Sequence, residues 1–137
     1  MWWLRALQLL APITLCATTA CNLTTSVERA EEVRIQVESS SAGPVTIITS
    51  NFFTVVEEET GDVRLNFLVS DTAFVDLPHD RTYALAPTSS FAVRLEAPLE
   101  EDIRVTLRAS TQGTQRFRRE GILLDLERPL DFFYTTN

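Results

Sequence analysis

The chain has 137 residues, a formal net charge of −7 and an isoelectric point near 4.7. A chain this acidic has no electrostatic attraction for nucleic acid or for anionic lipid headgroups, which excludes nucleic-acid binding. All of its cations are arginine, and it contains one histidine and two cysteines.

Residues 1–20 predict a secretion signal. A single cation, Arg5, precedes a mostly apolar run at residues 6–17. This run is shorter than the roughly 20 apolar residues that a membrane-spanning helix needs. Small residues follow it, as they do at a signal cleavage site. The mature chain is therefore expected to begin near Cys21.

The residues around this second cysteine resemble the processing site of bacterial lipoproteins. Thr19, Ala20 and Cys21 match the small residues and the lipid-accepting cysteine of that site, whereas Thr18 stands where the family usually has an aliphatic residue. The resemblance implies that residues 1–20 are removed and that Cys21 anchors the protein to a membrane through its lipid.

Two alternatives to lipidation stay open. In the first, an ordinary signal peptide is cut near Ala20 and Cys21 remains an unmodified thiol, which is an awkward group in an oxidising compartment. In the second, residues 1–20 stay in place as a membrane anchor, with Trp2 and Trp3 at the level of the headgroups.

After a polar tether at residues 21–31, alternation of apolar and polar residues predicts a series of β-strands. In chain order they are residues 33–38, 45–50 with 52–57, 63–70, 73–77, 82–86, 91–97, 103–109, 115–118, 122–126 and 130–134. A bulge is expected at Ser50 and Asn51, a hairpin turn at residues 58–62 around Gly61, and a strand end at residues 78–80.

This pattern predicts one all-β domain at residues 32–137, an antiparallel, immunoglobulin-like β-sandwich. Short connections favour antiparallel pairs. The alternation exposes one polar face of each sheet to solvent, so two sheets must pack together to bury their apolar faces. A domain of this size folds without a metal or a disulfide. Arginines that alternate with apolar residues predict ion pairs between neighbouring strands.

Several features together are loosely similar to the small immunoglobulin-like, membrane-tethered accessory proteins of the mycobacterial MmpS type. They are the N-terminal membrane element, Leu77-Pro78 at a strand end, FAVRLEA at residues 91–97, and VTLRAS followed by RREG near the C-terminus. The similarity spans about residues 33–126, and the paired cysteine that such domains often carry is absent. Those proteins assist a transport or envelope assembly, so the resemblance implies a non-catalytic accessory role.

His79, followed by Asp80, is the candidate for a metal ligand or a general base. A zinc site needs three or four ligands, and the predicted domain contains no second histidine and no cysteine. No serine lies in a G-x-S-x-G turn, and residues 21–137 lack a tryptophan that would stack on a sugar. We expect His79 to be a loop residue that neither binds a metal nor acts as a general base. We also expect no cofactor and no enzymatic activity.

Adjacent aromatic residues are the first candidate for contact with a partner. Neighbours on a strand point to opposite faces, so one of Phe132 and Phe133 needs cover from a loop or from a partner. The same argument applies to Phe52 and Phe53. The candidate contact at the C-terminal strand comprises Phe132, Phe133 and Tyr134.

Charged clusters are the second candidate. Arg116, Arg118 and Arg119 form the only basic cluster and suit an acidic partner, although pairing with glutamates on the neighbouring strand is the simpler expectation. The acidic turns at residues 57–62 and 100–102 lack the ligand spacing of a calcium loop and are expected to be solvated.

These observations predict an exported, lipid-anchored β-sandwich of the bacterial cell envelope, at the periplasmic or outer-membrane face. Its expected role is a non-catalytic binding, structural or accessory module, held to the membrane through Cys21 and in contact with another envelope protein. The alternative is an accessory subunit of an integral membrane complex whose N-terminal helix stays uncleaved.

Overall fold

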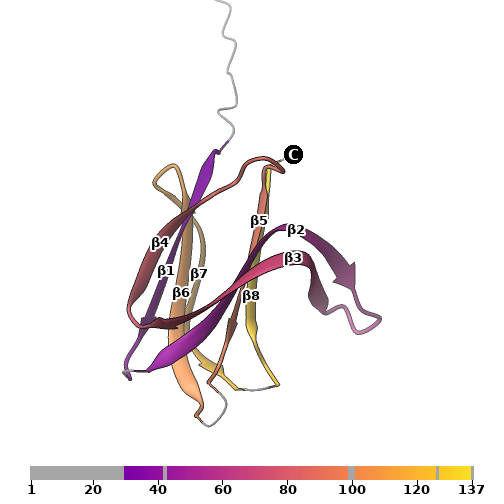
Figure 1. The fold of residues 1–137 in the computed structure, drawn as a ribbon. Helices are drawn as coiled ribbons and strands as arrows, with labels where there is room; N and C mark the ends of the chain where they lie inside the picture. Colours follow the sequence, from indigo (N-terminus) through magenta and orange to yellow (C-terminus); the bar gives the residue numbers. More distant parts are fainter. Residues whose placement is uncertain (1–29, 42, 99–100, 126, 137) are drawn as a thin grey trace, which may run out of the picture.

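The structure, a computed structural model, describes residues 30–41, 43–98, 101–125 and 127–136. These residues form eight β-strands (Figure 1). They are β1 (Glu32–Ser39), β2 (Pro44–Glu57), β3 (Val63–Asp76), β4 (His79–Ala84), β5 (Ser90–Glu96), β6 (Ile103–Thr111), β7 (Thr114–Leu124) and β8 (Leu130–Thr135).

The strands form two four-stranded sheets with the orders β4-β1-β6-β7 and β3-β2-β5-β8, and every pair of neighbours is antiparallel. The predicted single antiparallel β-sandwich is confirmed. Its strand order, which the sequence left open, places β1 between β4 and β6. In an immunoglobulin constant domain, by contrast, the first strand lies beside the second.

The core lies between the two sheets and is built from alternate residues of their central strands. On β1, β5 and β6 the inward positions are Val33, Ile35 and Val37; Phe91, Val93 and Leu95; and Val105, Leu107 and Ala109, all at most 1% exposed. The alternation predicted for these strands is therefore confirmed. Burying each of the larger side chains stabilises the fold by about 1.5–3 kcal/mol.

The chain changes sheets between β3 and β4, where the prediction was wrong in detail. Residues 78–80 were expected to end a strand and to form a loop. Instead β4 begins at His79, which lies opposite Val37 of β1. Pro78 lacks a backbone N–H and cannot continue a ladder, so it ends β3 at one sheet edge while the next residue joins the edge of the other sheet.

A second correction concerns β7, which was expected as two strands separated at residues 119–121. Gly121 adopts a positive φ of 61°, and the pairing between β6 and β7 shifts register between Val105 and Leu107. The shift absorbs the irregularity as a bulge. Arg104 Nη1 donates to the Gly121 carbonyl at 2.6 Å, which holds the bulge in place.

Arginine pairs join neighbouring strands as predicted. They are Arg34 with Asp80 across β1 and β4, Arg94 with Asp131 across β5 and β8, and Arg108 with Glu38 across β6 and β1. The packing also includes Ala30, which is 5% exposed although it falls in the segment expected as a tether. The Leu85 N–H donates to the Glu31 carbonyl at 2.8 Å.

Candidate functional site

The predicted contact residues on β8 lie in different environments. Phe132 is 7% exposed and packs in the core on Phe117, with ring centroids 4.9 Å apart. Phe133 points to the other face and is 40% exposed, and Tyr134 is half-buried against the core. Of the three, Phe133 alone presents a large apolar surface to solvent. The lipidation site, Cys21, lies outside the described residues.

The basic cluster lies on β7, which is an edge strand. Arg116 Nε donates to Thr111 Oγ1 at 2.8 Å, and the Arg119 guanidinium lies 5.9 Å from the ring centre of Phe117. Arg118 pairs with Glu120 of the same strand. Pairing with glutamates of the neighbouring strand was the wrong expectation, because β6 presents arginines and small polar residues beside β7.

His79 and Asp80 have separate partners. His79 Nε2 lies 3.2 Å from the Tyr83 hydroxyl. The Asp80 carboxylate accepts from Arg34 Nε at 2.7 Å and from Gln36 Nε2 at 3.0 Å. The hydrogen bond from Arg34 holds the pKa of Asp80 below its ordinary value. Successive strand residues point to opposite faces, so these two do not converge on one ligand. No cluster of three potential metal ligands occurs among the described residues.

The position of His79 predicts how stability depends on pH. Burial, and then the nearby Arg81 guanidinium, lower the pKa of His79 from about 6.5 in the unfolded chain. The unfolded state therefore takes up the proton first. The free energy of unfolding should be constant above about pH 6.5 and should fall as the pH decreases toward 5.

Denaturant unfolding at a series of pH values measures this effect. The His79→Gln variant should lose the slope between pH 7 and 5, whereas Asp125→Asn should keep it. A slope that persists in His79→Gln would mean that other groups cause it.

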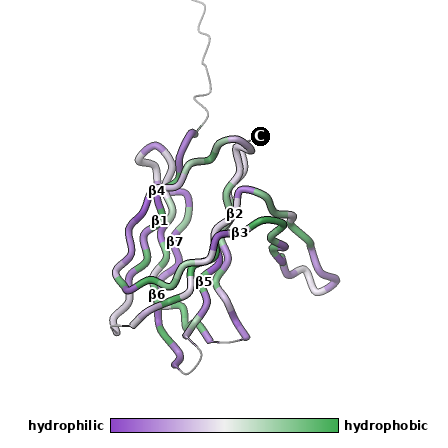
Figure 2. Tube along the Cα trace, in the orientation of Figure 1, coloured by the Kyte–Doolittle hydropathy of each residue, from purple (hydrophilic) through white to green (hydrophobic). Residues whose placement is uncertain are grey.

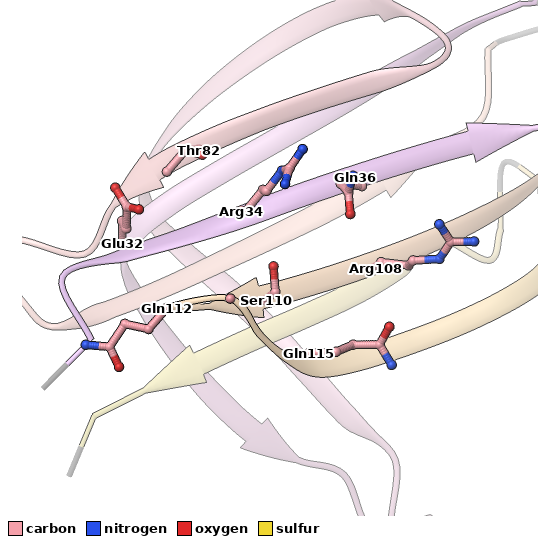
Figure 3. A pocket seen from close by; sticks show the side chains of 9 residues that line it. Glu32, Arg34, Gln36, Thr82, Arg108, Ser110, Gln112 and Gln115 are labelled. Atoms are coloured by element: carbon pink, nitrogen blue, oxygen red, sulfur yellow. The ribbon is translucent and has the colours of Figure 1, made fainter. Parts of the chain in front are cut away.

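A shallow polar hollow of about 510 Å³ lies over the outer face of the sheet that contains β1. Figure 3 shows residues from β4, β1, β6 and β7 around it. Both of its arginines are already engaged, Arg34 with Asp80 and Arg108 with Glu38. The remaining charged residue of the lining is Glu32, and a single exposed carboxylate selects an ionic ligand poorly, so the hollow is a weak candidate.

The strongest candidate is a hairpin whose turn at residues 58–62 was predicted, but whose projection from the sandwich was not. β2 pairs with β5 only through Thr46–Ser50, and beyond that point it pairs with β3 alone. Residues 52–69, hereafter the arm, therefore leave the sandwich as a two-stranded ribbon, seen at the right of Figure 1. An isolated two-stranded hairpin is marginally stable in water, so the arm needs support.

A hydrogen-bonded bulge at Ser50 and Asn51 fixes where the arm departs. Asn51 Nδ2 donates to the Ala84 carbonyl at 3.0 Å and to the Ser90 carbonyl at 2.7 Å. The Asn51 carbonyl accepts from Thr88 Oγ1 at 2.7 Å and from Ser90 Oγ at 3.0 Å. The register of β2 against β3 shifts here, as predicted. The bulge thus ties the base of the arm to the segment that joins β4 to β5.

The arm also rests on the outer face of its own sheet. The rings of Phe53 and Phe133 meet edge to face with centroids 6.0 Å apart. The Arg94 guanidinium lies 5.0 Å from the ring centre of Phe67 and donates to the Leu65 carbonyl at 3.2 Å. Leu65 is 2% exposed. The arm is therefore the cover that Phe133 required, although it leaves much of that ring exposed.

Most of the exposed apolar surface lies on the arm. Nine large apolar residues are exposed in the described part of the chain, and six of them are on the arm: Phe52, Val55, Val56, Val63, Leu68 and Val69. Phe74 follows on β3. Figure 2 shows this hydrophobic stretch ending in a hydrophilic tip. At that tip Gly61 adopts a φ of 84°, which confirms the predicted turn, and four carboxylates accompany a single arginine, Arg64.

Comparisons with protein-family models, with curated proteins and with solved structures find no match to this chain. Within the residues that the structure describes, no helix is long and apolar enough to cross a bilayer.

Proposed function

We propose that this chain is a non-catalytic binding module of the bacterial cell envelope, lipid-anchored through Cys21, that presents the arm to another envelope protein. The observation that carries the proposal is the concentration of exposed apolar side chains on one projecting hairpin. Monomeric proteins rarely leave such a patch uncovered, and where they do it usually marks an interaction site.

The charge of the arm indicates the kind of partner. Its tip carries Glu57, Glu58, Glu59 and Asp62 around the apolar ribbon. An acidic rim disfavours insertion into an anionic membrane surface and favours a protein whose apolar groove is flanked by basic residues. This arrangement fits a protein partner better than a lipid one.

The remaining polar clusters support a role without catalysis. His79 and Asp80 bond to different partners, and the arginines of the polar hollow are neutralised by Asp80 and Glu38. A catalytic constellation needs side chains that converge on one reacting atom. The groups described here diverge.

The membrane anchor is tested by the intact mass of the protein extracted from membranes, wild type beside Cys21→Ser. Lipidation predicts a mass of residues 21–137 plus acyl chains, and the variant should lose the acyl mass. If wild type and variant both had the mass of residues 1–137 without acyl chains, lipidation would be refuted. That result would favour the alternative, an accessory subunit of an integral membrane complex with an uncleaved N-terminal helix.

The docking role is tested by photo-crosslinking in isolated envelopes. A photoreactive residue at Val56, which is 47% exposed on the arm, should form an adduct with one envelope protein. Excess unlabelled chain should abolish that adduct, because binding is saturable. The same probe at Thr82, exposed on β4, should form none. Equal adducts from both positions, or none from Val56, would refute the role of the arm.

A further inference from the structure

One side of the sandwich is open, between β3 and β4. β3 is an edge of one sheet and β4 is an edge of the other, and among the described strands neither has a second neighbour. Ala73 of β3 lies directly opposite the core residue Ile47, so its side chain faces the other sheet. Ala73 is nevertheless exposed. Solvent therefore reaches the space between the two sheets on this side.

Two small hollows adjoin along this open side. The first, of about 230 Å³, is lined by residues of β2, β3 and β4. The second, of about 280 Å³, adds the base of the arm and the segment that follows β4. They share Thr49, Asp71 and Tyr83 and together form the side groove, which extends from Arg81 to Pro87. Small-molecule sites usually measure about 300–1,000 Å³, so a ligand would need both hollows.

Two opposite charges face into the side groove. Asp71 lies opposite Thr49, two positions along β2 from the core residue Ile47, and Arg81 lies opposite the core residue Ile35 of β1. Alternate and directly opposed positions share a face, so both side chains point toward the space between the sheets. Both line the 230 Å³ hollow, yet neither forms an ion pair with a residue that the structure describes. Their charges are therefore available to a ligand, unlike those of the arginines in the polar hollow.

The other end of the side groove is apolar. Phe52, Val69 and Pro87 line the second hollow together with the buried Phe91. Phe52 is 45% and Val69 is 65% exposed, so an apolar group that covers them removes apolar surface from water, which favours binding. The side groove thus presents a guanidinium in the first hollow, a carboxylate shared by both hollows and an apolar lining in the second.

We propose that the side groove binds a free α-amino acid with an apolar side chain. Arg81 binds the carboxylate of the ligand, because the arginine fork matches that group, and the Asp71 carboxylate accepts from the ammonium group. The side chain of the ligand packs on Phe52 and Val69. A peptide fits less well, because its two charged ends lie at opposite ends of the chain, whereas an α-amino acid carries both on one carbon. The proposal goes beyond the docking role of the arm and does not depend on it.

Protection of the strand edges is the competing explanation for these two charges. Inward-pointing charges on edge strands discourage the addition of further strands. Protection works with either sign on either edge and needs no recess. Here the signs are opposite, both groups face one hollow, and an apolar hollow adjoins it. Binding of a zwitterion with an apolar side chain uses all three features.

Equilibrium dialysis of the full chain in detergent, with L-phenylalanine as the probe, tests the proposal. After subtraction of a blank with detergent alone, binding should saturate with a Kd below about 1 mM, which is modest for a ligand of this size. Two analogues each lack one charge: 3-phenylpropionate has no ammonium group, and L-phenylalaninamide has no carboxylate. Each should bind about tenfold or more weakly, because one charged group of the groove loses its partner. Glycine, which lacks the apolar side chain, should also bind more weakly.

Two variants assign each charge of the ligand to one residue. Asp71→Asn should weaken the binding of L-phenylalanine about tenfold and leave that of 3-phenylpropionate unchanged. Arg81→Gln should weaken the binding of L-phenylalanine similarly and leave that of L-phenylalaninamide unchanged. The matched controls are Asp76→Asn, exposed on β3 outside the side groove, and Arg128→Gln, on a side chain 79% exposed. Both should keep the wild-type affinity for every probe.

Three results would overturn the proposal. The first is a Kd of the wild type for L-phenylalanine above about 1 mM. The second is equal affinity of the wild type for L-phenylalanine and 3-phenylpropionate, because the ring alone would then account for binding. The third is an Asp71→Asn variant that binds L-phenylalanine as the wild type does. The analogues are compared on the wild type, so the second result decides the matter even if a variant misfolds.

Discussion

Phe91→Ala should lower the free energy of unfolding by about 3–5 kcal/mol, the largest effect that we expect from a single substitution. Phe91 is 1% exposed on β5, and its ring centroid lies 5.0 Å from that of Tyr83. The ring bridges the two sheets, because β5 and β4 belong to different ones. Its removal loses transfer free energy and leaves a cavity that close-packed neighbours fill only in part.

Denaturant unfolding followed by circular dichroism measures this loss. Domains of this size are stable by about 5–15 kcal/mol, so the variant should unfold at a much lower denaturant concentration with an unchanged slope. Phe133→Ala is the matched control. It removes the same ring from the neighbouring strand, where the side chain is 40% exposed, and should cost about 1 kcal/mol. Equal losses in the two variants would show that Phe91 does not carry the packing between the sheets.

The central strands could be predicted because their signal is local. Phe91, Val93 and Leu95 alternate with residues on the other face, and a period of two directly reports a strand with one buried side. The same holds for β1 and β6. Strand order is different, because pairing β1 with both β4 and β6 depends on contacts distant in sequence. No single stretch of sequence encodes those contacts.

The arm could not be predicted because its residues resemble those of a core strand. Val55 and Val56 are β-branched residues in a run that continues directly from Ile47 and Ile48, which lie beside β5. The arm is exposed because the pairing with β5 ends at Ser50, opposite Ala92. The point at which this pairing ends is set by the tertiary fold and not by the local sequence pattern. The available signal was indirect: two adjacent phenylalanines and two adjacent valines after Asn51 break the alternation.

The ion pairs show the same division between local and distant information. Arginines at alternate positions correctly indicated cross-strand pairing, as Arg94 and Asp131 demonstrate with two hydrogen bonds of 2.7 Å. The arginines of β7 have no acidic partner on the neighbouring strand, because β6 carries arginines and no carboxylate. The partner of a charged side chain depends on which strand lies next to it. The sheet topology, and not the local sequence, determines that neighbour.

Asn51→Ala should release the arm while the sandwich stays folded. Asn51 is a positioning residue, because its side-chain amide ties the bulge of β2 to the carbonyls of Ala84 and Ser90. Alanine removes both hydrogen bonds, one exposed and one part-buried, and a typical hydrogen bond contributes about 0.5–1.5 kcal/mol to stability. The cost falls on the base of the arm, since the two acceptors lie at the end of β4 and the start of β5.

Hydrogen exchange resolves the effect by position. In Asn51→Ala the amides of residues 52–69 should exchange faster by about tenfold or more, as a loss above about 1.4 kcal/mol requires. Those of β1 and β6 should keep their wild-type protection. Asn66→Ala is the matched control, since Asn66 is an exposed asparagine of β3 within the arm, and it should change neither.

The crosslink from Val56 links this positioning to function. If the bulge orients the arm toward its partner, Asn51→Ala should weaken the Val56 adduct and Asn66→Ala should preserve it. An adduct of full strength in a variant whose arm exchanges faster would show that the partner recognises the hairpin without its fixed orientation. Uniform acceleration of exchange across both sheets would instead show that Asn51 stabilises the whole sandwich, contrary to its place at the base of the arm.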